Sequence, residues 1–203
     1  MKRLLSLALA LLLLAALPLS LTSCEETLPD DSEFALSEAE TDFVAIFVKG
    51  YGAIVVELYP DVAPITVQNF KKLVKEEFYD GTVFHRVIEN FMIQTGESAN
   101  GEEADMIRGE FALNGIKNDL KHERGVISMA RYNDPYYNTA SSQFFIVHKT
   151  SPHLDGSYAA FGRVLEGMDV VDEIATVKTN DNDRPVKKVK VETISFVAKK
   201  AAE

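Results

Sequence analysis

The sequence contains one cysteine, Cys24, among its 203 residues. A single cysteine excludes a disulfide framework, a CxxC redox motif and a cluster of thiolate metal ligands within the chain. The four histidines lack the close spacing of metal ligands, and the acidic segment 181–183 lacks the glycine and terminal glutamate of a calcium loop. The chain also has no G-x-S-x-G elbow and no P-loop. We therefore expect no metal site and no cofactor.

Basic residues are scarce. Lys and Arg number 21 against 31 Asp and Glu, which gives a formal net charge of −10. Nucleic-acid-binding domains usually present a basic surface, so this balance argues against nucleic acid as a partner. It also argues against electrostatic attraction to anionic lipids, so any attachment to a membrane is expected through a lipid anchor only.

The longest apolar run is too short to span a membrane. Leu4–Leu17 is apolar except for Ser6, and Pro18 ends the run after 14 residues, whereas a spanning helix needs about 20. Two basic residues precede the run and small residues follow it, which is typical of a secretory signal. We therefore interpret residues 1–23 as a signal peptide that is removed on export.

Cys24 ends the tetrapeptide Leu-Thr-Ser-Cys, which resembles the lipobox of bacterial lipoproteins. The resemblance implies that Cys24 is lipidated. It also implies an exported protein anchored to a bacterial cell membrane, at the outer face of the inner membrane or at the outer membrane. The alternative is an unmodified thiol beside an ordinary cleavage site.

An acidic segment separates Cys24 from the first strand-like pattern. Residues 25–42 contain eight acidic residues and no basic one. Such a composition buries too little apolar surface to offset the entropy lost on ordering. We therefore expect residues 24–42 to be the lipidated cysteine and a flexible tether, residues 43–198 one folded domain, and residues 199–203 a tail.

The domain from Phe43 onward combines short strand patterns with two helical ones. Pro64 suits the first turn of a helix, and the apolar residues Val67, Phe70, Leu73 and Val74 follow it at helical spacing. Residues 167–177 form a second, shorter amphipathic pattern. Strand patterns occupy 43–48, 53–59, 82–95 (a pair), 125–130, 142–147, 158–164 and 186–197. Many short strands with two helices indicate a closed or nearly closed antiparallel sheet.

Five sequence blocks follow one another within this domain. They are FHRVIENFMIQTG (84–96), GVISMAR (125–131), SSQFFI (141–146), LDGSYAAFG (154–162) and EGMDVV (166–171). In this order they resemble the cyclophilin peptidyl-prolyl isomerases, over about residues 43–197. The resemblance implies a mainly β fold, a closed eight-stranded antiparallel β-barrel capped by two α-helices. It also implies peptidyl-prolyl cis-trans isomerase activity on X-Pro bonds of exported proteins, which would assist folding in the cell envelope.

Arg86 is unusual because it lies among apolar residues in the first block. Burying an unpaired guanidinium is unfavourable, so a functional reason is expected. Isomerisation needs no nucleophile or proton shuttle, because the barrier of about 18–20 kcal/mol comes from the partial double bond alone. A donor near the amide nitrogen, which regains its lone pair as the amide twists, stabilises the transition state. We interpret Arg86 as this catalytic donor.

The resemblance also assigns substrate-binding residues. It implies that the proline ring is held by Phe91, Met92, Phe145 and Leu154. Gln94 would help to hold Arg86 and the substrate backbone, and the peptide before the proline would contact Ala130 and Gln143.

The sequence departs from the family pattern around this pocket. His153 stands where many eukaryotic members carry the tryptophan that grips cyclosporin, so weak or no cyclosporin binding is expected. Tyr158 stands where the family often has histidine, and both residues would still line the substrate site. Tyr132 stands where the family often has a small residue, and with the substrate-binding Arg131 it would narrow or extend the peptide groove.

Two kinds of function remain open, and a third, a lipoprotein scaffold with a degenerate pocket, is disfavoured because the set of motifs is nearly intact. The first is an isomerase whose partners are proline-containing peptides and unfolded protein clients, acting as a monomer. The second is a module that keeps the proline groove but holds its clients with little catalysis.

Overall fold

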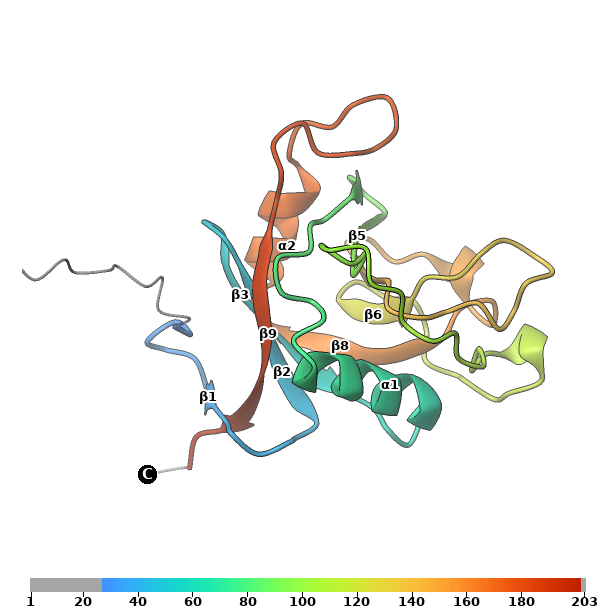
Figure 1. Cartoon of the computed structure of the whole chain (residues 1–203), viewed down its shortest axis with the longest axis horizontal. Helices are drawn as coiled ribbons and strands as arrows, with labels where there is room; N and C mark the ends of the chain where they lie inside the picture. The colour runs from blue at the N-terminus through green and yellow to red at the C-terminus, as the bar shows by residue number, and fades with distance from the viewer. Residues whose placement is uncertain (1–26, 202–203) are drawn as a thin grey trace, which may run out of the picture.

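The structure, a computed structural model, describes residues 27–201, in which nine strands and two α-helices are present (Figure 1). The strands are β1 (Phe34–Leu36), β2 (Phe43–Val48), β3 (Gly52–Leu58), β4 (Arg86–Ile88), β5 (Met92–Thr95), β6 (Val126–Met129), β7 (Phe144–Val147), β8 (Ala160–Glu166) and β9 (Val191–Lys199). The helices are α1 (Pro64–Lys75), α2 (Met168–Ala175) and the 3-10 turns η1 (Ala112–Asn114) and η2 (Pro152–Leu154). The expected mainly β fold with two α-helices is confirmed. The predicted signal peptide and Cys24 lie outside the described residues.

All the strands belong to one curled sheet with the order β1-β9-β2-β3-β8-β6-β7-β5-β4, in which neighbouring strands are antiparallel. The segments before β4 and β9 approach each other. Val83 forms an isolated bridge with Lys190, and the Phe84 N–H donates to the Val189 carbonyl oxygen over 2.9 Å.

This contact between the segments before β4 and β9 does not make a continuous ladder. The closed eight-stranded barrel is therefore not confirmed, since the described sheet has nine strands and an open order. β4, at the end of this order, has only three residues and pairs with β5 alone.

The two α-helices cover the inner face of the curled sheet and lie toward opposite ends of β9 (Figure 1). The predicted stripe of α1 is confirmed, because Val67, Phe70, Leu73 and Val74 are all buried. The Phe70 ring lies 5.3 Å from the rings of Phe144 in β7 and Phe161 in β8, measured between centroids. No helix within residues 27–201 is long and apolar enough to cross a membrane.

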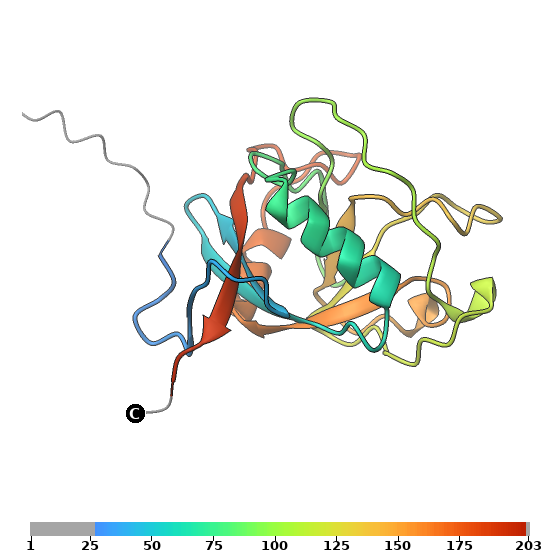
Figure 2. The same ribbon diagram turned by 60° about the horizontal axis from the view of Figure 1, so that its bottom comes forward.

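The long segment between β5 and β6 is attached to α1 through Glu110. Its carboxylate is buried and accepts hydrogen bonds from the Ile65 N–H (3.1 Å), the Thr66 N–H (2.8 Å) and the Thr66 hydroxyl (2.7 Å). The first N–H groups of a helix have no partner within the helix. Glu110 supplies that partner and so fixes the segment to the helix. Figure 2 shows the course of this long segment, drawn in light green, beside α1.

The outer face of the sheet carries two further apolar clusters, and β1 covers the first. Phe34 is only 2% exposed and packs with Phe47, Val55 and Val197. β1 pairs with the end of β9, where Phe34 lies opposite Lys199. The prediction of a flexible tether over residues 24–42 is therefore wrong at β1, and Lys199, assigned to the tail, belongs to β9. The three-residue strand β1 is held against the sheet because the aromatic side chain of Phe34 covers the apolar surface beneath it.

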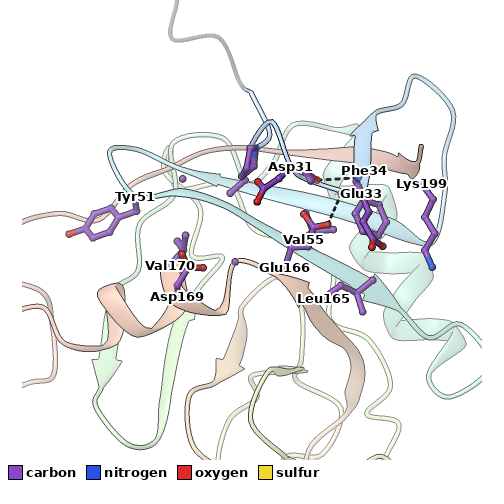
Figure 3. Close-up of a pocket in the computed structure, with 15 residues that line it drawn as sticks. Asp31, Glu33, Phe34, Tyr51, Val55, Leu165, Glu166, Asp169, Val170 and Lys199 are labelled. Carbon is purple, nitrogen blue, oxygen red and sulfur yellow. Dashed lines mark hydrogen bonds between the residues drawn. The ribbon is translucent and has the colours of Figure 1, made fainter. Parts of the chain in front are cut away.

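The chain just before β1 also encloses a pocket of about 750 Å³ against β3, β8 and the start of α2 (Figure 3). The Glu33 N–H donates to Glu166 Oε1 over 2.9 Å at one wall of this pocket. The charged side chains around it are Asp31, Glu33, Glu166, Asp169 and Lys199. The segment is thus joined to the domain by a ladder and by a separate hydrogen bond.

Candidate active site

Four residues from the sequence blocks, one on each of four strands, form a row across the outer face of the sheet. Arg86 of β4 lies directly opposite Gln94 of β5, Gln94 lies opposite Phe145 of β7, and Phe145 lies opposite Ser128 of β6. Residues that face each other across antiparallel strands point to the same side of the sheet. The row therefore brings the arginine, the glutamine and the phenylalanine to one surface.

Arg86 reaches solvent because β4 is at the edge of the sheet. Its side chain is 43% exposed, and its Nε lies 3.6 Å from Oδ2 of Asp183, which is also partly exposed. Exposed ion pairs contribute little free energy, so this pairing leaves the guanidinium available to a ligand. Arg86 is thus an accessible cation at the rim of an apolar surface rather than a buried charge.

The two glutamines assigned to substrate binding contact each other. Gln94 Nε2 donates to Gln143 Oε1 over 2.9 Å. Gln143 also accepts the Ala130 N–H at its carbonyl oxygen over 2.9 Å, which sets Ala130 beside it. The structure therefore brings all three of these predicted residues together next to Arg86.

The second outer cluster forms an apolar floor beside the glutamines. Met92, Phe145 and Leu154 are each 6% exposed or less and belong to this cluster, against which Phe91 and Tyr158 are partly buried. The Phe145 and Tyr158 rings meet edge to face with centroids 5.9 Å apart, and Phe91 lies 5.4 Å from His153. The predicted proline-pocket residues thus lie together, with His153 and Tyr158 at their border.

Arg131, which is predicted to contact substrate, is held by three hydrogen bonds within the protein. Its side chain is only 4% exposed. Its guanidinium donates to the carbonyl oxygens of Ser157 (2.9 Å) and Tyr132 (2.8 Å) and to the Asp134 carboxylate (2.8 Å). Because its donors are taken up inside the protein, Arg131 fixes the loop that follows β6.

That loop presents two tyrosines to solvent. Tyr132 is 65% exposed and Tyr136 is 62% exposed. The hydroxyl of Thr139 accepts the Tyr132 N–H over 3.0 Å and donates to the Tyr136 carbonyl oxygen over 2.9 Å, which holds the loop in shape. Between this loop and η2 lies a pocket of about 470 Å³ lined by Arg131, Asn133, Asp134, His153, Leu154, Ser157 and Tyr158.

Sequence reasoning missed a buried polar chain beneath the apolar floor. His122 Nδ1 lies 3.1 Å from Asp155 Oδ1, and His122 Nε2 lies 3.0 Å from Ser128 Oγ. Asp155 is 33 residues from His122 in the sequence, and no spacing rule connects the three residues, so only the fold reveals the contacts. Within residues 27–201, no cluster of three or more His, Cys, Asp or Glu side chains is arranged to hold a metal ion.

The molecule is thus a mainly β protein in which the outer face of a curled antiparallel sheet places an arginine beside an apolar pocket. Comparison with known proteins gives the family, because residues 43–196 match the model described as cyclophilin type peptidyl-prolyl cis-trans isomerase/CLD. The chain belongs to this family and is a cyclophilin-type peptidyl-prolyl cis-trans isomerase.

Individual relatives agree with this assignment. A peptidyl-prolyl cis-trans isomerase-like 1 of Emericella nidulans is 42% identical over 147 residues, which are 71% of this chain and 89% of that protein. A peptidyl-prolyl cis-trans isomerase-like 2 of Rhizopus delemar is 37% identical over 86% of this chain, but the match spans only 33% of that protein. A cyclophilin-type isomerase of Cryptosporidium parvum, crystallised in the presence of the dipeptide Ala-Pro, superposes with a TM-score of 0.65 and 28% identity, over 76% of this chain and 98% of that one.

Proposed function

We propose that Arg86 is the catalytic donor of this isomerase and that Phe91, Met92, Phe145 and Leu154 hold the proline ring. The observation that carries the proposal is the row in which Arg86, Gln94 and Phe145 face one surface. A proline ring on the apolar floor would bring its amide nitrogen toward the guanidinium. The crystal structure of the Cryptosporidium relative, obtained in the presence of Ala-Pro, supports a proline-containing peptide as the ligand.

The chemistry asked of this site is the rotation of one amide bond. The ground-state amide nitrogen shares its lone pair with the carbonyl, and the twisted state localises it. A hydrogen bond from Arg86 to that nitrogen therefore forms only as the bond twists, which is the condition for acceleration. Lowering the barrier by about 7 kcal/mol corresponds to roughly 10⁵-fold in rate.

The site residues next to the proline ring have separate roles in this proposal. Gln94 and Gln143, joined by their side-chain hydrogen bond, present amide groups to the substrate backbone. Arg131 acts indirectly by fixing the loop that carries Tyr132. His153 replaces the tryptophan that other members use for cyclosporin, so binding of that ligand is weak or absent.

We further propose that the protein is exported and lipid-anchored through Cys24, where it assists the folding of other exported proteins. The proposal rests on the signal-like residues 1–23 and on the lipobox-like tetrapeptide. In Figure 1, β1 lies to the left of β9 and β6 lies to its right. An anchor before β1 would therefore join the domain on the other side of β9 from β6, a strand of the candidate active site.

Labelling with a radioactive fatty acid in a bacterial host tests the anchor. The full chain should take up the label and sediment with membranes, whereas a Cys24→Ser variant should take up none. Equal labelling of the two proteins would contradict lipidation at Cys24.

A client-holding module is the second candidate, and the exposed pair Tyr132 and Tyr136 favours it. Aromatic side chains supply a large contact area for an unfolded chain. Saturable binding of an X-Pro peptide without acceleration of its isomerisation would favour this function over the first.

A further inference from the structure

A polar chain of three side chains lies directly under the proline-pocket floor. Ser128 and His122 are buried, with exposed fractions of 0% and 1%. The His122 ring is nearly parallel to the Phe145 ring, at 19°, with centroids 6.2 Å apart. The imidazole of His122 therefore stacks against the ring of Phe145, a residue of the predicted proline pocket.

The hydrogen bonds of His122 define where its proton lies. The Asp155 carboxylate can only accept, so His122 Nδ1 carries the hydrogen of the neutral ring. His122 Nε2 then has a free lone pair and accepts from the Ser128 hydroxyl. In this state both ring nitrogens and the serine hydroxyl are satisfied in the interior.

The same residues hold η2, which carries Leu154. The backbone N–H of His122 donates to Asp155 Oδ1 over 2.9 Å, and the carbonyl oxygen of His122 accepts the Ser151 N–H over 2.8 Å. Ser151 and Asp155 are the residues that flank η2 on either side. His122 is thus bonded to both ends of η2 and packed against Phe145. It therefore links Leu154 and Phe145, two residues of the apolar floor.

A serine, a histidine and an aspartate joined in this order by hydrogen bonds could also suggest the catalytic triad of a hydrolase. A nucleophilic serine must reach its substrate. Ser128 is fully buried and its hydroxyl is bonded to His122, so the chain of hydrogen bonds is a support and not a reaction centre.

We propose that His122 is a positioning residue for the isomerase, whose neutral ring sets Phe145 and Leu154 for the proline ring and whose protonation disturbs them. This inference rests on the proposed function of the pocket. Protonation would place a hydrogen on Nε2 facing the Ser128 hydroxyl, which would have to turn its own hydrogen away. It would also leave a cation beneath an aromatic ring and among apolar side chains.

The charges around His122 fit this role. Burial is the main reason that the pKa of His122 is lowered, and the hydrogen bond that its ring donates to Asp155 acts against this shift. Lys121, whose Nζ lies 3.5 Å from Asp155 Oδ2, and His153 of η2 are the neighbouring basic groups that lower the pKa further. β6 and β7 contribute the uncharged Ser128 and Phe145. The ring is therefore neutral at neutral pH and gains its proton only at a lower pH than an ordinary histidine does.

The first test compares pH profiles of the full chain with those of His122→Gln. The wild-type kcat/KM on an X-Pro peptide should fall as the pH is lowered through the pKa of His122, which burial places below the ordinary value for histidine. His122→Gln keeps a polar side chain without a titrating group, so its profile over this range should be nearly flat. At pH 8 its kcat/KM should be lower by several-fold, mainly through a higher KM. His148→Gln, which removes a histidine paired with Asp172 instead, is the matched control and should keep the wild-type profile.

The second measurement separates this inference from the proposed function. Nuclear magnetic resonance of the full chain with labelled phenylalanine and histidine should show the Phe145 ring signals shifting with the same midpoint as the His122 nitrogens. This shift should be lost in His122→Gln, with circular dichroism confirming the fold at each pH. A Phe145 signal that does not follow His122, or a wild-type pH profile in the variant, would overturn the positioning role. An inactive wild-type protein with a coupled Phe145 shift would overturn the proposed function alone.

Discussion

Arg86 and Gln94 face each other across β4 and β5, so the candidate catalytic cation and the amide proposed to bind substrate leave the sheet on the same side. The arginine is 43% exposed because β4 is an edge strand. Its apolar sequence neighbour Val87 points the other way, into the main core. Side chains alternate between the two faces of a strand, and this explains how an arginine can lie within an apolar block. Val87 is buried in the core, whereas Arg86 on the other face reaches solvent.

Removing the buried carboxylate of Glu110 is expected to destabilise the domain. Glu110→Ala leaves the Ile65 and Thr66 N–H groups at the start of α1 without their partner. Losing several charge-assisted hydrogen bonds in the interior should lower the free energy of unfolding by about 3 kcal/mol. Urea denaturation measures this change.

The control for Glu110 is Glu76→Ala at the other end of α1. Glu76 forms only an exposed ion pair with Lys72, at 3.9 Å, so its removal should change stability by less than about 0.5 kcal/mol. Equal effects of the two substitutions would mean that Glu110 does not cap the helix.

Phe34→Ala tests whether β1 is part of the folded domain. Phe34 is 2% exposed and its ring lies 5.3 Å from that of Phe43, so truncation should lower the free energy of unfolding by about 3–4 kcal/mol. Leu36 of the same strand is 54% exposed, and Leu36→Ala should change the free energy of unfolding by less than about 0.5 kcal/mol. If Phe34→Ala unfolds like wild type in urea, β1 is dispensable and the segment behaves as a tether.

The stability of the domain should decrease in mildly acidic solution. Burial lowers the pKa of both His122 and His85, so each histidine binds a proton more readily in the unfolded chain, where its pKa is about 6.5. The unfolded state then holds more protons than the folded state below that pH, and stability is lost as the pH falls. Urea midpoints at about pH 7.5 and about pH 5.5 measure the loss, which His122→Gln should reduce. A midpoint that rises on acidification would contradict the sign of these pKa shifts.

Tyr132→Ala is expected to change the preference for the residue before proline. Tyr132 is 65% exposed on the loop that Arg131 fixes, beside the groove where that residue would lie. Its removal should alter the ratio of kcat/KM between peptides with large and small residues before proline by about threefold to tenfold. A series of otherwise identical X-Pro peptides measures the ratio, and an unchanged ratio would exclude Tyr132 from substrate selection.

The sequence predicted those features that depend on local periodicity or on the ordered blocks. The apolar stripe of α1 followed from helical spacing, and the residues near Arg86 followed from the blocks around them. β1 was missed because the acidic composition of residues 25–42 outweighs a strand of three residues, and its stability comes from pairing with β9 far along the chain.

Side-chain partners were the least predictable part of the site. Nothing in the order of residues shows that Arg131 donates hydrogen bonds to Ser157, Tyr132 and Asp134. The contact of His122 with Asp155 likewise joins positions that only the fold brings together. Sequence spacing predicts elements, whereas such contacts depend on how the elements pack.

The rate of cis-to-trans relaxation of a short X-Pro peptide tests the central claim most directly. It is measured with the full chain and with Arg86→Ala, whose fold is checked by circular dichroism. Because Arg86 is half-exposed and weakly paired, its removal should leave stability nearly unchanged and lower kcat/KM by about 10²–10³-fold. A folded Arg86→Ala protein that accelerates the reaction as well as wild type would contradict the role of Arg86 as the catalytic donor.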